Sequence, residues 1–273
     1  MLKLRVITAV VLLVLFLLAL FALPDFGWIA FVIVVVMQGA VEWSRLAKFS
    51  SANAKLFWGI TLSMMLGLAW FDASYSPEQQ AMLHLPIYAV SALLWLIVVP
   101  TWLMTNWKAP SVAMAVTGWA VLVPTGLAMM DLRAIDPWLL IFVMALVAAA
   151  DISAYFAGRR FGKNKLAPSI SPGKTWEGVA GAMLGASVYV VAVWSFHPYL
   201  SQHDILPILL LASWWWVGLA VIGDLFESAM KRQAGVKDSG ALLPGHGGLL
   251  DRIDALTSTL PLAALVIMLQ HLS

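Results

Sequence analysis

Long apolar runs separated by short polar segments follow one another along all 273 residues of the chain. An α-helix needs roughly 20 consecutive, mainly apolar residues to cross the hydrocarbon core of a bilayer. Runs of this kind, each bounded by Pro, Gly or charge, predict nine membrane-spanning helices at about 6–23, 26–43, 55–71, 85–104, 110–130, 137–157, 178–196, 205–224 and 255–272. We therefore expect an all-α, polytopic integral membrane protein.

The composition supports a membrane protein and limits its chemistry. Hydrophobic residues make up 62% of the chain and charged residues 11%, with a mean hydropathy of +0.90, which is far from the composition of a soluble globular domain. There is no cysteine, so any metal ion must be held by oxygen or imidazole ligands, and a hard cation such as Mg²⁺ fits best. The formal net charge of +2 is too small to indicate a nucleic-acid partner.

The positions of the basic residues predict which side of the membrane each loop occupies. Met1–Arg5 is basic, but the apolar run after it is longer than the roughly 7–15 residues of a signal peptide and lacks a clear cleavage site. We therefore expect an uncleaved first helix with its N-terminus in the cytoplasm. With nine spans, every Lys and Arg except Arg133 then falls on the cytoplasmic side. Several acids, including Glu42 and Glu227, also lie at or near that face, so the chemistry is expected to face the cytoplasm.

Most of the charge on the predicted cytoplasmic side lies in two long loops, 158–177 and 225–254. Residues 1–136 are predicted to form structural, lipid-facing helices, and residues 137–273 to form the helices and cytoplasmic loops that carry a catalytic site. In the second region, the spacing of Gly181 and Gly185 predicts close helix packing within the chain.

Gly223–Asp254 is an unusually charged segment for this chain. It combines acids that can hold a divalent cation, bases that can neutralise phosphates, and the glycine-rich sequence Pro244-Gly245-His246-Gly247-Gly248, through which backbone N–H groups can approach an anion. Its charged residues are Asp224, Glu227, Lys231, Arg232, Lys237, Asp238, Asp251, Arg252 and Asp254. Together these parts indicate phosphoryl chemistry.

Asp224 and Asp251 are the candidate metal ligands. Asp224 ends an apolar span, and a carboxylate at membrane depth costs about 2.5–3.5 kcal/mol at the helix centre, so it usually faces a partner or a cavity. The alternative for Asp224 is an ion pair with Lys231 or Arg232. Asp251 begins the last span beside the glycine-rich sequence, and a second carboxylate meeting Asp224 would complete a cation site. Acids of a first helical turn also serve the helix dipole and capping, which is enough to explain Asp254.

Two further candidates are Asp151 and His246. Asp151 and Tyr155 share a helix face at i and i+4, although an ion pair between Asp151 and the Arg159-Arg160 cluster is the alternative. His246 fits three readings: a metal ligand, a phosphate hydrogen-bond donor, or a loop residue without a special role.

The sequence Gly173-Lys174-Thr175 is suggestive of a P-loop but is not one, because Pro168 stands where that motif needs its first glycine and no strand precedes it. A turn before a helix start, with Lys174 and nearby hydroxyls, can bind a phosphate in a similar way. Capping of the same helix explains Glu177 equally well.

Read as continuous strings, these segments resemble the signature of the phosphatidate cytidylyltransferase, or CDP-diacylglycerol synthase, family. The longest string is Ser228-x-Met230-Lys231-Arg232-x4-Lys237-Asp238-x-Gly240-x2-Leu243-Pro244-x-His246-Gly247-Gly248-Leu249-x-Asp251-Arg252-Ile253-Asp254. Two shorter strings are Asp151-x-x-Ala154-Tyr155-x-x-Gly158 and Ser171-Pro172-x-Lys174-Thr175-x-Glu177-Gly178. The resemblance covers the C-terminal half, and the earlier part of the chain matches only as apolar spans. Gly173 departs from the pattern, because some members carry a basic residue there, and one positive charge fewer beside the triphosphate would weaken nucleotide binding.

The resemblance implies an enzyme that transfers CMP from CTP to phosphatidic acid, giving CDP-diacylglycerol and pyrophosphate, at the cytoplasmic face of a bacterial inner membrane. It implies that Asp224 and Asp251 hold Mg²⁺, with or without a second cation, and it suggests a homodimer. The residues implied to act in catalysis are Asp224, Asp251, Lys231, Arg232, Lys237, Asp238, His246 and Arg252. Those implied to bind substrate are Asp151, Tyr155, Ser171, Lys174, Thr175, Glu177, Ser228, Gly247, Gly248 and Asp254.

Two alternatives stay open at this point. A CTP-dependent polyprenol kinase, or a cytidylyltransferase for another lipid phosphate, would use the same parts and differ in its product. A cation-coupled transporter would use Asp151, Asp224 and Asp251 as intramembrane ion sites. Against the transporter, these acids gather at one face instead of the midplane, and the basic glycine-rich segment would have no use.

Overall fold

The computed structural model of the chain describes residues 2–105, 109–243, 245 and 247–272. Each of the nine predicted spans corresponds to a helix or to one continuous helical run, which confirms the all-α polytopic fold class. The long helical elements are α1 Leu2–Ala22, α2 Asp25–Leu46, α3 Ser51–Ser74, the run of α4 Pro77–Leu93, η1 Leu94–Val98 and α5 Val99–Thr105, then α6 Ser111–Ile135, α7 Pro137–Phe161, α8 Trp176–Phe196, α10 Leu206–Ala234 and α11 Leu250–Leu272. All except α1 are long and apolar enough to cross a membrane, and in α1 the described apolar part is Ile7–Ala22.

Three helices extend beyond their predicted apolar spans and carry candidate residues with them. α7 continues to Phe161, α10 continues to Ala234, and α11 already begins at Leu250. Hydropathy marks where the bilayer ends, whereas the hydrogen bonds of a helix continue until a cap stops them, so the two limits differ. Helix α10 stops at Gly235, whose left-handed backbone (φ 76°) is the usual C-terminal cap.

The predicted loop 158–177 contains a two-stranded antiparallel hairpin that the sequence did not predict. Strand β1 is Lys165–Ala167 and β2 is Ser171–Thr175, with Lys165 opposite Thr175 and Ala167 opposite Ser171. Strands this short carry too little alternation for the hydrophobic pattern to indicate them. The side chain of Thr175 accepts a hydrogen bond from the backbone N–H of Gly178 at 3.1 Å and so caps α8.

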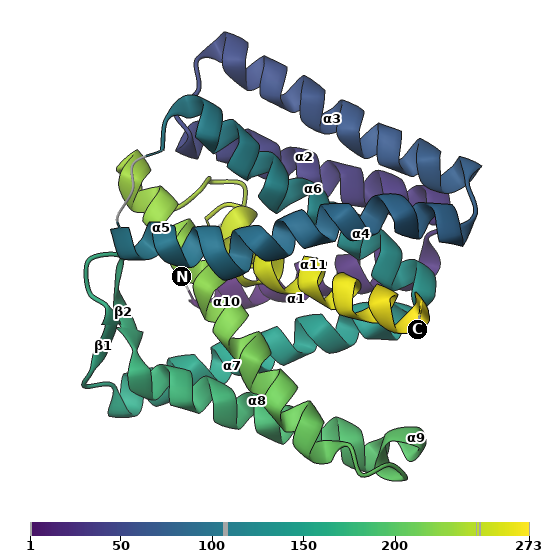
Figure 1. Ribbon diagram of the computed structural model, residues 1–273. Helices are drawn as coiled ribbons and strands as arrows, with labels where there is room; N and C mark the ends of the chain where they lie inside the picture. The colour runs from purple at the N-terminus through teal and green to yellow at the C-terminus, as the bar shows by residue number, and fades with distance from the viewer. Residues whose placement is uncertain (1, 106–108, 244, 246, 273) are drawn as a thin grey trace.

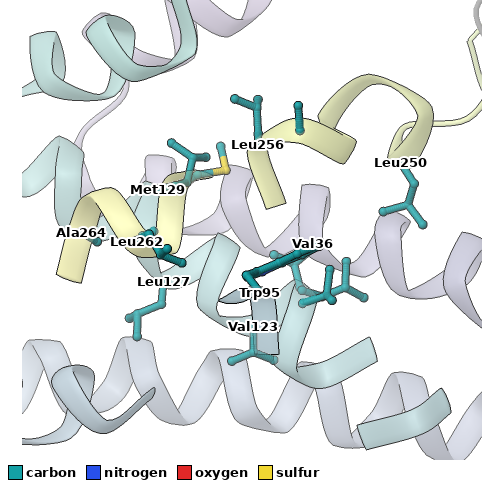
Figure 2. Packing of buried hydrophobic residues seen from close by; sticks show 14 of the residues in the cluster. Val36, Trp95, Val123, Leu127, Met129, Leu250, Leu256, Leu262 and Ala264 are labelled. Carbon is teal, nitrogen blue, oxygen red and sulfur yellow. The ribbon is translucent and has the colours of Figure 1, made fainter. Parts of the chain in front are cut away.

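Helix α6 lies at the centre of the main hydrophobic core. It packs against α2, α3 and α11, and Figure 2 shows Leu127 and Met129 of α6 beside Leu256 and Leu262 of α11. Two indole groups of α2 bind α6 backbone carbonyls: Trp28 Nε1 donates to Met129 O at 3.2 Å and Trp43 Nε1 to Met114 O at 2.8 Å. These bonds satisfy the polar atoms of two large, almost fully buried side chains.

Helices α7 and α8 form a tightly packed pair, and α10 crosses from this pair to the main group of helices (Figure 1). A Cβ atom on Gly181 or Gly185 would collide with Ala157 or Ser153 of α7, so both glycines are needed for this close approach. The predicted within-chain use of the two glycines is therefore confirmed. The pair matters for function because Asp151 lies on α7 and the β-hairpin connects α7 to α8.

Candidate active site

Four parts of the chain that are distant in sequence meet at one end of the structure. They are the C-terminal half of α10, the first turns of α11, the end of α7, and the β-hairpin. In Figure 1 the hairpin and the connection from α10 to α11 lie on the same side of the molecule. The hairpin is tied to α10 by two contacts: Lys174 Nζ lies 2.5 Å from Asp224 Oδ2, and Arg232 Nε donates to Ile170 O at 3.3 Å.

Asp224 is the acid on α10 to which the hairpin lysine binds. Besides Lys174, its partner is the Ser228 hydroxyl, which lies 3.4 Å from Oδ1, one helical turn away. Asp151 of α7 and Asp254 of α11 both interact electrostatically with Asp224 and with Lys174. Asp224 is therefore surrounded by groups from three other elements, and its ion pair is made with Lys174 and not with Lys231 or Arg232, the partners considered from the sequence.

Asp251 is bound through both carboxylate oxygens and is nearly buried, with 5% of its side chain exposed. Its Oδ1 lies 2.6 Å from Lys231 Nζ. Its Oδ2 accepts hydrogen bonds from the backbone N–H groups of Ser239 and Gly248, both at 2.8 Å, and lies 3.0 Å from the Ser239 hydroxyl, whose single proton is shared with Glu42. One carboxylate thus joins the end of α10 to the glycine-rich loop.

Gly247 has to be glycine in this loop. Its φ of 82° lies in the left-handed region, and a Cβ atom there would lie 2.6 Å from Asp251 Oδ2. Glycine is therefore required at position 247 by its left-handed backbone and by the close approach of the loop backbone to Asp251.

Lys231 connects Asp251 to a further acid, Glu227, which was noticed in the sequence but given no role. Lys231 Nζ lies 2.5 Å from Glu227 Oε2, and the Glu227 side chain is buried. Glu227 also interacts electrostatically with Asp254. Asp254 therefore lies between the Asp224 and Asp251 groups and links them.

Helix capping does not account for Asp254. Because α11 begins at Leu250, Asp254 lies beyond the first turn, where the dipole and capping interactions act. The close contact of α10 with α11 at Gly223, where a Cβ atom would lie 2.7 Å from Asp254 O, brings this residue beside Asp224.

Glu42 of α2 holds the same loop from the opposite side, and its role was not predicted. Its side chain is completely buried and accepts four hydrogen bonds: from Leu249 N (2.8 Å), Leu250 N (2.9 Å), the Ser239 hydroxyl (2.9 Å) and Gln38 Nε2 (2.8 Å). The two backbone donors are at the start of α11, where N–H groups have no partner within the helix. The only sequence signal for Glu42 was a lone acid inside an apolar span.

Other candidates lie nearby but take no part in this network within the described residues. Tyr155 is exposed and its hydroxyl accepts from Arg159 Nη1 at 3.0 Å, so Arg159 pairs with Tyr155 and not with Asp151. Glu177 accepts from Asn164 Nδ2 at 2.7 Å and fixes the turn between α7 and β1. Lys237, Asp238 and Arg252 are exposed, and Ser171 is half-buried. His246 lies outside the described residues.

The network carries more negative than positive charge. Its five carboxylates are Asp151, Asp224, Glu227, Asp251 and Asp254, and its two ammonium groups are those of Lys174 and Lys231. With all seven groups ionised, three negative charges are uncompensated. Glu227 Oε1 is buried without a hydrogen-bond partner, while Lys231 lies against the other oxygen, Oε2. An all-oxygen donor set with excess negative charge suits a hard divalent cation.

A separate group of potential metal ligands lies elsewhere. In the described part of the chain, Asp72, His84 and Asp131 form the one cluster of three such residues whose donor atoms all lie within 4.8 Å of one another. They belong to α3, α4 and α6 and include none of the predicted site residues.

A polytopic helical membrane protein that gathers carboxylates, ammonium groups and a glycine-rich loop at one end has the construction of a membrane-bound enzyme of phosphoryl or nucleotidyl transfer. The sequence model of the cytidylyltransferase family matches residues 3–270. The chain belongs to this family and is a nucleotidyltransferase.

Curated relatives resemble the chain over nearly its whole length. It is 36% identical to the phosphatidate cytidylyltransferase of Haemophilus influenzae, over 96% of each chain, and 36% identical to that of Pseudomonas aeruginosa, over 97% of this chain and 96% of the relative. It is 33% identical to the phosphatidate cytidylyltransferase of Brucella abortus, over 85% of this chain and 81% of the relative.

Proposed function

We propose that the protein is a phosphatidate cytidylyltransferase, which transfers CMP from CTP to phosphatidic acid and releases pyrophosphate. An oxygen of the lipid phosphate forms a bond to the α-phosphorus of CTP while the bond to the bridging oxygen of the β-phosphate breaks, and pyrophosphate leaves with that electron pair. The attacking phosphate is already an anion, so the reaction needs no strong general base. It needs groups that bring two anions together and neutralise the charge on the leaving pyrophosphate.

The observation that carries the proposal is the joined network of Asp224 with Lys174 and Asp251 with Lys231. The two ammonium groups are held by carboxylates of α10 and α11, and an arriving phosphate can replace a carboxylate as the partner of each ammonium group. Arg232, Lys237 and Arg252 supply further positive charge at the same end of the molecule. Gly248 N–H is already donated to Asp251, so we assign this glycine to loop geometry and not to phosphate binding.

The excess of carboxylates supports a bound divalent cation, for which Mg²⁺ is the best match. Asp224 and Asp251 are the proposed ligands, with Asp254 and Glu227 close to both. When bound, Mg²⁺ supplies charge neutralisation for the phosphates of CTP. Asp151 is proposed to keep Lys174 oriented, because it shares the electrostatic surroundings of Lys174 and Asp224.

The proposed place of the reaction is the cytoplasmic face of a bacterial inner membrane, with the N-terminus also in the cytoplasm. The distribution of Lys and Arg supports this orientation. Because the chain has no cysteine, this orientation can be tested with single cysteines introduced at exposed positions. In spheroplasts, a membrane-impermeant maleimide should label Gln202→Cys and should label Ala241→Cys only after permeabilisation. The reverse pattern would place the site outside.

The proposal includes a homodimer. It also requires that the lipid substrate reach this site from the bilayer. An apolar hollow of about 270 Å³ is lined by α3, α6 and residues near the α2–α3 turn, and no candidate site residue contributes to its lining. We therefore do not assign this hollow to the acyl chains.

The direct test is product formation by the purified protein in detergent, with α-³²P-labelled CTP, phosphatidic acid and Mg²⁺. We expect label in a chloroform-soluble CDP-lipid, dependent on both lipid and metal. Label that stays in the aqueous phase would contradict the proposal. Transfer from γ-labelled CTP to polyprenol would then indicate a kinase, and solute uptake by sealed vesicles without CTP consumption would indicate a transporter.

A further inference from the structure

The cluster of Asp72, His84 and Asp131 lies at the end of the helices opposite to the candidate active site. Asp131 is two residues before Arg133, whose guanidinium lies 3.0 Å from Asp25 Oδ1 at the start of α2. Glu42, which binds the glycine-rich loop, is 17 residues further along the same helix, or about 25 Å at 1.5 Å per residue. The cluster is therefore independent of the network around Asp224.

His84 is the centre of the cluster. It is completely buried, and each ring nitrogen faces a carboxylate: Nδ1 lies 3.0 Å from Asp131 Oδ2, and Nε2 lies 3.0 Å from Asp72 Oδ1. Asp131 Oδ2 also accepts a hydrogen bond from the Tyr88 hydroxyl at 2.6 Å. Asp131 is an acceptor for both neighbours, so the Nδ1 atom of His84 must carry its proton.

This leaves two atoms with lone pairs facing each other. With Nδ1 protonated in a neutral ring, Nε2 and Asp72 Oδ1 are both acceptors, and a positive charge has to lie between them. Neither atom has a hydrogen-bond partner of acceptable alignment, although both are buried and only 3.0 Å apart. A proton shared between them would favour a nearly linear hydrogen bond. A metal ion does not require a linear arrangement. Two ligand atoms that each lie about 2.1 Å from the ion, with a ligand–metal–ligand angle of about 90–110°, are about 3.0–3.4 Å apart.

We infer that Asp72 and His84 bind a divalent first-row metal ion at this end of the protein. One imidazole with one carboxylate is a donor set that favours Zn²⁺ over Mg²⁺. Asp131 accepts the other N–H of the ring, which is the arrangement that usually orients a metal-binding histidine. The side chains of Asp72 and Asp131 are 19% and 11% exposed, so the cluster lies at the edge of the helix group, although the two ligand atoms themselves are buried. The ion joins α3 to α4, the contact of His84 with Asp131 ties this pair to α6, and the role is structural and does not depend on the substrate.

The test measures metal bound by the full-length protein in detergent. The protein is stripped with EDTA, placed in excess Mg²⁺ to occupy all-oxygen sites, and titrated with Zn²⁺ or with Co²⁺ as a spectroscopic probe. We expect one Zn²⁺ retained per chain, a visible Co²⁺ band, and a higher Tm on Zn²⁺ addition. His84→Gln and Asp72→Asn should each lose the retained metal and the Tm shift. Asp131→Asn should weaken Zn²⁺ binding by about 10–100-fold, as expected for the partner of a metal-bound histidine.

Asp224→Asn is the matched control, because it removes a carboxylate at the other end and should keep both the Zn²⁺ and the Co²⁺ band. Two results would overturn the inference. One is wild-type protein that retains no Zn²⁺ and shows a Tm insensitive to Zn²⁺ and EDTA, which would identify His84 as an imidazolium held between two carboxylates. The other is a Co²⁺ band that disappears in Asp224→Asn. Both are measured without relying on His84→Gln, so poor folding of that variant would not remove the test.

Discussion

The two ends of this helical protein both concentrate carboxylates, but they are built differently. At the end with the candidate active site, five acids and two lysines come from three helices and a hairpin, and a glycine-rich loop is held between Asp251 and Glu42. At the other end, Asp72, His84, Asp131 and Tyr88 all project from helices. At both ends the acids project from packed helices, which keep their geometry fixed, but only at the first end are they joined by a hairpin lysine and by a loop that needs its own anchors. The first arrangement suits chemistry and the second suits a structural ion.

The largest effect is expected from the proposed metal ligands. Asp224→Asn and Asp251→Asn should each lower kcat by about 10²–10³-fold, comparable to the loss of a group that stabilises transition-state charge. Excess CTP or lipid should restore neither variant, because the loss is not one of substrate affinity. Near-normal turnover would remove that residue from the metal role. Only Asp251→Asn should also expose the loop to limited proteolysis, because only Asp251 binds Ser239 and Gly248.

Glu42→Gln should have the next largest effect, although Glu42 is a positioning residue. A hydrogen bond to a charged group contributes about 1.5–3 kcal/mol, and the amide cannot accept from all the backbone and hydroxyl donors around it. We expect kcat/KM to fall by about 10–100-fold, with faster hydrogen exchange at residues 239–250. Gln38→Met, which removes only one of the four donors, is the control and should change both quantities little. Loss of activity with unchanged exchange would contradict the positioning role.

Two of the three glycines with a left-handed backbone in the α10–α11 connection provide a more precise test. Gly235 and Gly247 have φ values of 76° and 82°, but a Cβ atom meets nothing within 4 Å at Gly235 and lies 2.6 Å from Asp251 Oδ2 at Gly247. The left-handed conformation costs roughly 1–2 kcal/mol for alanine in both cases. Gly247→Ala should therefore lower kcat at least about tenfold more than Gly235→Ala, since about 1.4 kcal/mol corresponds to tenfold. Equal effects would mean that the contact with Asp251 is unimportant.

The far end should respond in stability and not in turnover. Tyr88→Phe removes a hydrogen bond to the Asp131 carboxylate, worth about 1.5–3 kcal/mol. For a chain of this size, each kcal/mol corresponds to about 2–4 °C in Tm. We expect Tm to fall by several degrees while kcat stays within about twofold, as measured by thermal unfolding in detergent and by the CTP assay. A large fall in kcat with an unchanged Tm would show that the two ends are coupled.

The smallest effect concerns Gly173, the position at which some members of the family that the sequence resembles carry a basic residue. Gly173 is exposed on β2, has no positive φ, and leaves open space for a side chain next to Lys174. Gly173→Lys should lower the KM for CTP by less than about tenfold, because an exposed ion pair contributes only about 0–1 kcal/mol. Gly173→Gln is the control of similar length without charge. A KM that is the same in both variants would mean that this position does not face the triphosphate.

The sequence predicted well what depends on local pattern. Each of the nine predicted apolar spans falls on a helix or a continuous helical run, because hydropathy is a property of each segment alone. The partners of the charged residues were not predictable. Asp224 binds Lys174, 50 residues away, whereas the sequence offered Lys231 or Arg232 as its alternative partners. The capping explanation for Asp254 failed because α11 begins earlier than its apolar span.

By itself, then, the sequence determined that this chain is a polytopic helical membrane protein with the residue types of phosphoryl chemistry at its C-terminal half. Bilayer thickness sets the length of each apolar run, and the composition of the charged segments needs no knowledge of the fold. Only the tertiary structure decided that Glu42 and Asp251 hold one loop from two sides, that Asp254 links two groups of acids, and that His84 lies between Asp72 and Asp131. These are contacts between helices far apart in sequence, and their geometry is set by how the helices pack.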